Sequence, residues 1–192
     1  MYTHELKIPK ERVAVIIGKE GETKKELESD TGSKIDIDSH EGDVHVSCED
    51  PVNLLTAKEV VKAIGRGFNP DIARLIIKQD TAFELLNILD YVKTKKDIIR
   101  LKGRIIGAEG KSRKTIEDLT DVHISVYGKT VGIIGDTQRV TVARRAIESL
   151  LSGSPHSKVY HWLEKQRREL KKMELLDSSL IKEDKDATDT GE

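Results

Sequence analysis

The chain has little of what most often ties a protein to an oxidising or membrane environment. Of its 192 residues, one is cysteine, two are methionine, four are proline and 4% are aromatic. The single cysteine, Cys48, excludes an internal disulfide and a cysteine-rich zinc site, as is usual in a reducing compartment. No run of about 18 apolar residues is present to cross a bilayer, and residues 1–5 lack the basic-then-apolar pattern of a signal peptide. We therefore expect a cytoplasmic protein with no membrane contact.

The chain also has almost no net charge, because 33 Lys and Arg face 34 Asp and Glu. A net charge of −1 by itself argues against a nucleic-acid binder. The average conceals an asymmetry, since residues 173–192 carry seven acids against two lysines, which leaves residues 1–172 at +4. Residues 177–192 are acidic and poor in large apolar side chains, so we expect a disordered tail there.

An internal repeat organises the remaining sequence. Residues 16–37 read IIGKEGETKKELESDTGSKIDI, and residues 105–126 read IIGAEGKSRKTIEDLTDVHISV. Nine of these 22 positions are identical without a gap, where unrelated stretches share about one or two. Glu28 and Glu117 are one of the identical pairs. The chain is therefore a tandem duplication of a module of about 80 to 90 residues.

Hydrophobic periodicity predicts the same order of elements in each copy. A strand opens the copy, a helix ends in Gly-x-x-Gly, a second helix follows, and a two-stranded hairpin leads to a longer closing helix. The predicted elements are strand 5–8, helices 13–17 and 22–30, strands 34–38 and 44–48 and helix 51–64 in the first copy, and strand 85–91, helices 98–106 and 112–119, strands 123–127 and 130–134 and helix 137–151 in the second. The order β-α-α-β-β-α, found twice, predicts an α+β fold in which three helices cover one face of each three-stranded antiparallel sheet.

The two Gly-x-x-Gly turns are candidate phosphate sites. Glycines allow a sharp turn and the close approach of another backbone, and the following helix begins with free N–H groups and a partial positive charge. The same pattern at Gly132 to Gly135 lies inside an apolar strand, where glycines that serve packing are the better interpretation.

Each copy resembles a type I KH domain, whose GxxG loop clamps the backbone of about four single-stranded nucleotides. The resemblance implies that apolar side chains beside each loop support the bases and that the basic residues of the next helix bind phosphate. In the first copy the RNA-binding residues that it identifies are Gly18, Lys19, Glu20, Gly21, Lys24 and Lys25, with Ile17 and Ile35 as the apolar walls. In the second copy they are Arg104, Ile106, Gly107, Ala108, Glu109, Gly110, Lys111, Ser112, Arg113, Lys114, Ile124 and Val126. Both loops depart from the commonest KH loop by carrying an acid, Glu20 or Glu109.

The two copies differ in charge. Residues 93–114 contain nine bases and two acids, a net charge of +7, whereas the aligned window 4–25 has a net charge of +2. Lys and Arg supply most of the sequence-independent affinity for phosphate. We therefore expect the second module to be the main RNA clamp and the first to be auxiliary or to face a protein; a basic helix face that is merely solvated is the alternative.

The segment after the second copy narrows the resemblance to one family. Ser154 and Pro155 are a helix start signal, and Val159, Leu163 and Met173 follow helical spacing, which predicts a basic helix packed on the second module. Two KH modules followed by G-S-P-x-x-K-V-Y resemble the partner-of-Nob (Dim-two) family of small-ribosomal-subunit assembly factors, in its short archaeal form. The resemblance implies binding to the 3′ end of small-subunit (16S) rRNA beside the Nob endonuclease, and contact with the alpha subunit of initiation factor two. The helix adds Lys158, Arg167 and Arg168 as candidate RNA-binding residues.

The predicted domains are therefore a first KH domain at 1–78, a second at 79–152, a basic helix at 153–176 and a disordered acidic tail at 177–192. Catalysis is not expected. The segment 107–112 ends like a P-loop, but that pattern requires a glycine where the chain has Ile105, and the six histidines contain no i, i+4 pair for a zinc helix. We expect no enzyme activity, cofactor or metal. A KH regulator of another RNA and a scaffold for protein partners with vestigial loops stay open as alternatives.

Overall fold

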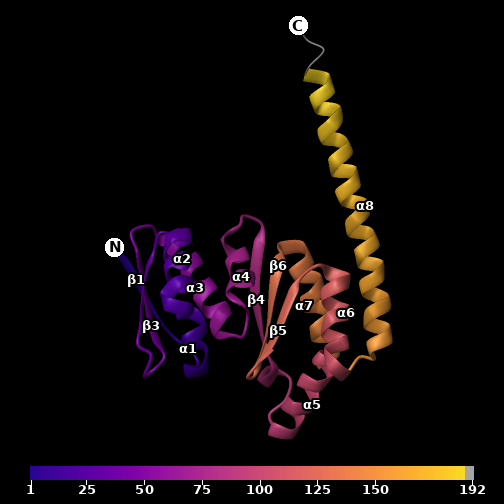
Figure 1. Ribbon diagram of the computed structural model, residues 1–192. Coiled ribbons are helices and arrows are strands. Elements are labelled where there is room, and N and C mark those ends of the chain that lie inside the picture. Colours follow the sequence, from indigo (N-terminus) through magenta and orange to yellow (C-terminus); the bar gives the residue numbers. More distant parts are fainter. Residues whose placement is uncertain (189–192) are drawn as a thin grey trace.

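The structure contains the same unit twice, followed by one long helix (Figure 1). The computed structural model describes the backbone of residues 1–188 and the side chains of residues 1–176. We call residues 2–65 the first module and residues 81–151 the second module. Each holds a three-stranded antiparallel sheet with its closing strand in the middle, in the orders β1-β3-β2 and β4-β6-β5. The expected α+β fold is confirmed.

The elements follow the predicted order. The first module comprises β1 (Tyr2–Lys7), α1 (Lys10–Ile17), the 3-10 turn η1 (Lys19–Gly21), α2 (Glu22–Thr31), β2 (Lys34–Ile37), β3 (Asp43–Cys48) and α3 (Pro51–Gly65). The connection between the modules holds α4 (Pro70–Ala73) and η2 (Arg74–Ile77). The second module comprises β4 (Thr81–Asn87), η3 (Ile88–Asp90), α5 (Lys95–Ile106), η4 (Ala108–Gly110), α6 (Lys111–Thr120), β5 (His123–Tyr127), β6 (Thr130–Asp136) and α7 (Thr137–Leu151), and α8 (His156–Thr188) follows it.

Side-chain caps fix where the closing helices begin. Asp50 accepts a hydrogen bond from the Val52 N–H at 2.8 Å, and Pro51 occupies the first helical position of α3. In the second module Asp136 accepts from the N–H groups of Gln138 and Arg139 at the start of α7. Both helices thus start directly after the central strand of their sheet and fold back across it.

Sheets and helices alternate in layers (Figure 1). The helices of the first module and the η2 turn lie against the second sheet, so that sheet is covered on both faces and Val131 to Ile134 of β6 are all buried. A Cβ at Gly132 would lie 2.6 Å from the Phe68 ring, and one at Gly135 would lie 2.9 Å from Val122. These glycines therefore serve packing, which confirms the interpretation of Gly132 to Gly135 as part of a strand.

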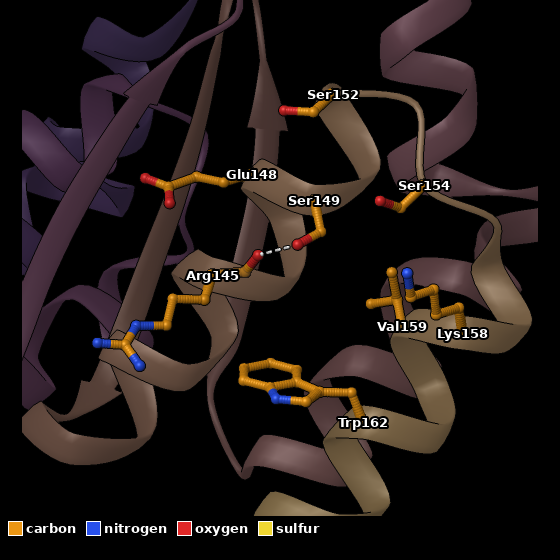
Figure 2. Close-up of a pocket in the computed structure, with 8 residues that line it drawn as sticks. All are labelled: Arg145, Glu148, Ser149, Ser152, Ser154, Lys158, Val159 and Trp162. Carbon is orange, nitrogen blue, oxygen red and sulfur yellow. Dashed lines mark hydrogen bonds between the residues drawn. The ribbon is translucent and has the colours of Figure 1, made fainter.

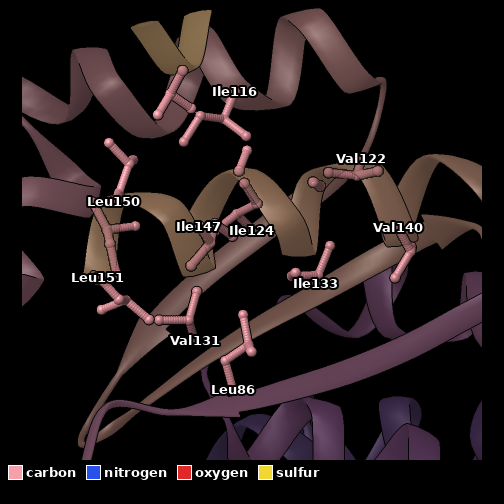
Figure 3. Close-up of a cluster of buried hydrophobic side chains, with 14 of the residues drawn as sticks. Leu86, Ile116, Val122, Ile124, Val131, Ile133, Val140, Ile147, Leu150 and Leu151 are labelled. Carbon is pink, nitrogen blue, oxygen red and sulfur yellow. The ribbon is translucent and has the colours of Figure 1, made fainter. Parts of the chain in front are cut away.

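Each module has its own core. Figure 3 shows the core of the second module, where Ile116 of α6, Ile124 of β5 and Ile147 of α7 meet between the sheet and the helices. Val159 and Leu163 of α8 belong to the same core and are 3% and 0% exposed. Helix α8 is therefore anchored on the second module by the first part of its predicted apolar face, whereas Met173, which the pattern places on the same face, is 62% exposed.

The structure differs from the expected bounds of the strand that opens the second module. Strand β4 begins at Thr81 instead of residue 85 and ends at Asn87, because the Asn87 side chain caps the turn η3 and Ile88 donates to the Lys129 carbonyl at 2.9 Å. The backbone of α8 is helical to Thr188, and the expectation of a disordered acidic tail from residue 177 stays a prediction. Residues 177–188 contain neither glycine nor proline, which lets the helix continue. The rest of the expected tail, 189–192, lies outside the described residues.

Candidate nucleic-acid interface

The two GxxG loops have the same backbone conformation. Gly107, Glu109 and Gly110 have φ values of 73°, 53° and 77°. The matching residues Gly18, Glu20 and Gly21 have 71°, 53° and 78°. Three of the four residues of each loop have a positive φ, which is strained for residues that carry a side chain. Because both copies keep this costly conformation, it is a specific feature of the fold.

The two glycines of each loop serve different purposes. A Cβ at Gly107 would lie 2.7 Å from the Ser112 backbone nitrogen, so this glycine lets the loop close onto the first turn of α6. Around Gly110 no atom lies within 4 Å of the position that a Cβ would take. The second glycine therefore leaves an open approach to the backbone where α6 begins.

The charges beside the second loop are partly compensated within the protein. The exposed Glu109 lies 3.8 Å from the Lys111 ammonium, and Arg113 lies 3.5 Å from Glu117. Lys114 is exposed and has no ion pair among the residues that the structure describes. These side chains line a hollow between the loop and β5, which we call the loop hollow; it is lined by Glu109, Gly110, Arg113, Lys114, Glu117, Asp118, Asp121, Val122 and His123.

A glutamate that the sequence patterns did not single out for the site fixes the strand beside the loop. Glu117 on α6 accepts a hydrogen bond from the Ile124 N–H at 2.7 Å, and Glu28 on α2 accepts from the Ile35 N–H at 2.8 Å. Each carboxylate sets the distance between the helix after the loop and the strand that faces it. The available signal was the identity of Glu28 and Glu117 within the repeat.

The expected apolar walls divide into core and surface. Ile124 and Ile35 are 4% and 0% exposed, so both pack inside the modules and offer little surface to a ligand. Ile106, Val126 and Ile17 are half-buried at the edge of the loops. The apolar surface beside the second loop is therefore provided by Ile106 and Val126.

Arg104, which the sequence places in the basic run before the loop, is a structural residue. Its guanidinium donates to the Leu150 carbonyl at 3.2 Å and the Ser154 carbonyl at 2.7 Å, and the Arg104 carbonyl lies 2.8 Å from His156 Nε2. These bonds hold the end of α5 to the connection between α7 and α8. Two of the five guanidinium donors of Arg104 are thus used within the protein, and the expectation that this side chain contacts RNA stays a prediction.

In the first module a different arginine joins the first helix to the end of the closing helix. Arg12 on α1 donates to the carbonyls of Ile64, at 2.9 Å, and Phe68. Arg12 and Arg104 do not align in the sequence repeat, yet both join the first helix of a module to the end of its closing helix.

The first loop is exposed but less basic. Lys19, Glu20 and Lys25 are exposed, whereas Lys24 is half-buried and lies 3.8 Å from Glu28. Ser112 and its counterpart Thr23 pack beneath the first glycine of each loop. Ser112 is 4% exposed, so it supports the loop from below.

The predicted basic residues of α8 point in several directions. Lys158 lines a pocket between α7 and α8, and Arg168 lies on another face of α8 with His161, Lys165 and Lys172. Arg167 is half-buried, and its Nε makes no hydrogen bond within the described part of the chain. The structure therefore does not gather these three side chains beside the loop hollow.

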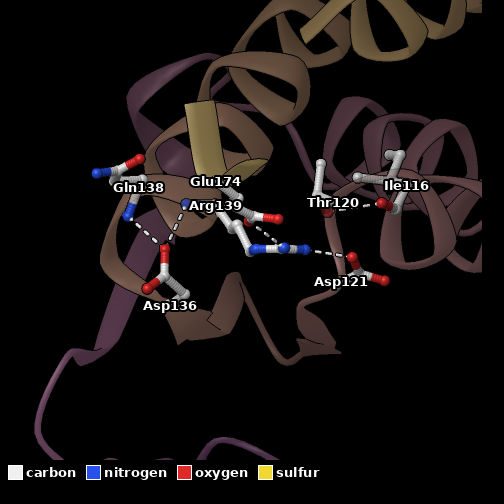
Figure 4. Close-up of polar contacts among 7 residues, drawn as sticks. All are labelled: Ile116, Thr120, Asp121, Asp136, Gln138, Arg139 and Glu174. Carbon is white, nitrogen blue, oxygen red and sulfur yellow. Dashed lines mark hydrogen bonds and ion pairs between the residues drawn. The ribbon is translucent and has the colours of Figure 1, made fainter. Parts of the chain in front are cut away.

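Figure 4 shows the polar contacts around Arg139, one of whose partners, Asp121, lines the loop hollow. Arg139 of α7 pairs with Asp121 at the end of α6, and with Glu174 of α8 at 2.6 Å. Thr120 donates to the Ile116 carbonyl at 2.7 Å, which finishes α6. The two ion pairs of Arg139 therefore join α8 to α6 and α7.

The first module supports the strand that lies beside the second loop. Ser125 donates to the Arg66 carbonyl at 2.9 Å, and the Tyr127 hydroxyl donates to the Glu11 carboxylate. That hydrogen bond raises the pKa of Tyr127 above its ordinary value. Ser125 and Tyr127 alternate along β5 with residues that face the helices, so the first module backs β5 from the opposite side.

The described residues contain no group of three or more His, Cys, Asp or Glu side chains arranged to hold a metal ion. Within the same part of the chain, no helix combines the length and apolar character that crossing a bilayer requires.

Known proteins carry both modules. The family model for the eukaryotic-type KH domain, KH-domain type I, matches residues 82–168, and the model for the KH domain matches residues 3–63. The KH domain-containing protein MJ0443 of Methanocaldococcus jannaschii is 46% identical over 171 residues, which are 87% of this chain and 75% of that protein. The RNA-binding protein PNO1 of Oryzias latipes is 38% identical over 114 residues, 58% of this chain, and the match spans 47% of that protein's length.

One solved structure resembles this chain over nearly the whole length of the solved chain. Dim2p of Pyrococcus horikoshii OT3, in a complex with a/eIF2alpha and rRNA, superimposes with a TM-score of 0.81 and 42% sequence identity over 88% of this chain and 95% of that one. The repeated fold, the two GxxG loops and these matches define a tandem KH-domain protein. The chain belongs to the family of archaeal Dim2p and eukaryotic PNO1, the partner-of-Nob family.

Proposed function

We propose that the protein binds single-stranded RNA at the 3′ end of small-subunit rRNA during ribosome assembly in the cytoplasm, as a binding protein and not an enzyme. The observation that carries this proposal is the GxxG loop of the second module, which presents an open backbone at the start of α6 next to the uncompensated Lys114. Membership of a family that includes a Dim2p solved with rRNA supports this choice of RNA.

The second module is the main clamp in this proposal. Lys93 precedes α5, and Lys95 and Lys96 lie in its first turn. All three are exposed and have no ion pair among the described residues, so these cations of the basic window are available to phosphates. The first loop has an equivalent backbone, and Lys19 and Lys25 beside it are exposed without an ion pair among the described residues. The sequence window that leads to it, however, has a net charge of +2 against +7 for the window that leads to the second loop. Its module has a second task, because Arg66 and Glu11 back strand β5 of the second module.

We further propose that the alpha subunit of initiation factor two and the Nob endonuclease are protein partners. Support for the first comes from the Dim2p complex, which contains a/eIF2alpha. The first sheet offers a surface for such contacts, because its outer face, with Glu5, Lys34, Asp36 and His45, is exposed to solvent. Nob follows from the family to which the chain belongs.

A loop variant tests the RNA site. Ala108 is exposed, so changing Ala108 and Glu109 to Asp adds one negative charge at the loop without disturbing the core. The matched control changes Lys19 to Ala and Glu20 to Asp in the first loop, which also lowers the local charge by one. Binding of a fluorescent rRNA 3′-end fragment is measured for each variant against a shuffled fragment.

We expect the second-loop variant to lose about tenfold or more in affinity, because an added charge about 4 Å from a phosphate costs on the order of 1 to 4 kcal/mol. The first-loop control should lose less. An equal loss in both variants would refute the ranking of the modules. If the wild type itself has no affinity for the fragment while the second-loop variant still binds the alpha subunit, the scaffold hypothesis replaces the RNA clamp.

A further inference from the structure

A pocket separate from the loop hollow lies between α7 and α8 (Figure 2). It encloses about 550 Å³, within the range of small-molecule sites. Its walls are Arg145 from α7, Ser154 from the connection, and Lys158 and Trp162 from α8. We call it the α7–α8 pocket.

The charge of the α7–α8 pocket is positive. The one acid in its wall, Glu148, pairs with Arg144, whose Nε lies 2.8 Å from the Glu148 carboxylate and whose Nη1 lies 2.9 Å from Glu84, and the wall itself carries two cations against this one acid. Arg145 and Lys158 are both exposed, and neither has an ion pair among the residues described. Two uncompensated cations therefore border one hollow, an arrangement that attracts phosphate.

The pocket also contains the chain's single tryptophan. Val159 and Leu163 hold this part of α8 in the core, and Trp162 packs half-buried at the edge of that core while lining the pocket. Its indole extends from α8 toward α7, where Arg145 lies (Figure 2). An indole fixed on one side and accessible on the other is a stacking surface for a nucleobase.

The α7–α8 pocket lies at the same end of the helical layer as the second GxxG loop. Ser154 on its rim accepts the hydrogen bond from Arg104, which is one helical turn before Gly107. A nucleic-acid strand that leaves the loop therefore has a short route to the pocket around the end of α5.

We propose that the α7–α8 pocket is a second subsite for single-stranded RNA, in which one base stacks on Trp162 and the adjacent phosphates lie against Arg145 and Lys158. This inference rests on the proposed function, because the loop hollow holds the neighbouring part of the same strand. Aromatic and cationic side chains facing one hollow favour a nucleotide over an acidic peptide, which would use the cations alone.

The test compares two RNA lengths. A fragment of about four nucleotides fills the loop, and a fragment of about ten has enough chain to reach the pocket. In the wild-type protein the longer fragment should bind more tightly and should quench the fluorescence of Trp162 on stacking. Changing Arg145 and Lys158 to Ala should remove most of the gain, with a slope of log affinity against log salt that is lower by about 1.4 for the longer fragment only.

Trp162→Ala should cost the longer fragment about tenfold in affinity, and Trp162→Phe, which keeps the packing, should cost less. The matched control changes Lys10 and Lys78, two exposed cations of the first module and the connection, to Ala and should keep the gain. An unchanged gain in the Arg145 and Lys158 variant, or unchanged Trp162 emission on saturation with the longer fragment, would overturn the subsite.

The controls separate this inference from the proposed function. If the Ala108 and Glu109 double-Asp variant still binds the short fragment as the wild type does, the proposed function fails. If that variant loses binding but the α7–α8 pocket variants behave as the wild type, only the subsite fails. Quenching of Trp162 by an oligoglutamate peptide but not by RNA would also overturn the subsite and assign the pocket to an acidic protein segment.

Discussion

The two glycines of the second loop should differ sharply when each is replaced by alanine. At Gly107 the backbone has φ 73° and ψ 177°, a region that is essentially restricted to glycine, and an added methyl group would meet Ser112 at 2.7 Å. Strain of about 1 to 3 kcal/mol and overpacking of about 1 to 3 kcal/mol predict a total cost of about 2 to 6 kcal/mol. At Gly110 the backbone has φ 77° and ψ 8°, and the methyl group would point into open space.

The cost at Gly110 should therefore be the left-handed conformation alone. That is about 1 to 2 kcal/mol, reduced by about 0.4 to 1 kcal/mol because alanine restricts the unfolded chain. Urea unfolding followed by circular dichroism measures both variants. With a slope of about 1 to 3 kcal/mol per molar urea, Gly107→Ala should lower the midpoint by about 1 M or more and Gly110→Ala by much less.

RNA binding separates the two positions a second time. Gly110→Ala folds, but its methyl group lies at the open approach to the start of α6, so we expect weaker RNA binding at nearly normal stability. Equal losses of stability at Gly107 and Gly110 would refute the different purposes that the structure assigns to them.

Two further predictions concern charge. Glu109→Gln removes the acid that pairs with Lys111, so RNA affinity measured by filter binding should rise several-fold. Glu20→Gln in the first loop should change the affinity less. A fall in affinity for Glu109→Gln would count against phosphate binding at the second loop. The raised pKa of Tyr127 means that its hydrogen bond to Glu11 stabilises the fold fully below pH about 10 and is lost as pH rises through the folded-state pKa. Unfolding measured across alkaline pH should therefore show a steeper loss of stability for the wild type than for Tyr127→Phe, and identical profiles would contradict the contact.

Much of the fold could be predicted because it is local and repeated. The GxxG turns, the alternating strands and the capped closing helices each depend on neighbours in the sequence. Because the chain is a repeat, each of these patterns occurs twice and the two copies can be compared. The end of β4 at Asn87 was harder to predict, because a strand that is partly covered on both faces loses the alternation that marks its limits.

The functional surface was less predictable, because composition does not show which cations are already used. Arg104 belongs to the most basic window of the chain, yet its guanidinium is bonded to the carbonyls of Leu150 and Ser154, some fifty residues away. Arg145 and Trp162 drew no attention in the sequence, since they meet only when α8 packs against α7. Contacts between distant segments thus decide which residues remain available to a ligand.

The salt dependence of RNA binding tests the central claim most directly. Lys111, Arg113 and Lys114 follow the second loop, and changing all three to Ala should lower the slope of log affinity against log salt by about 2, as expected for three lost contacts to single-stranded RNA. Changing Lys24 and Lys25 in the first module should lower it less. An unchanged slope in the triple variant would contradict the assignment of the second GxxG loop as the main RNA clamp.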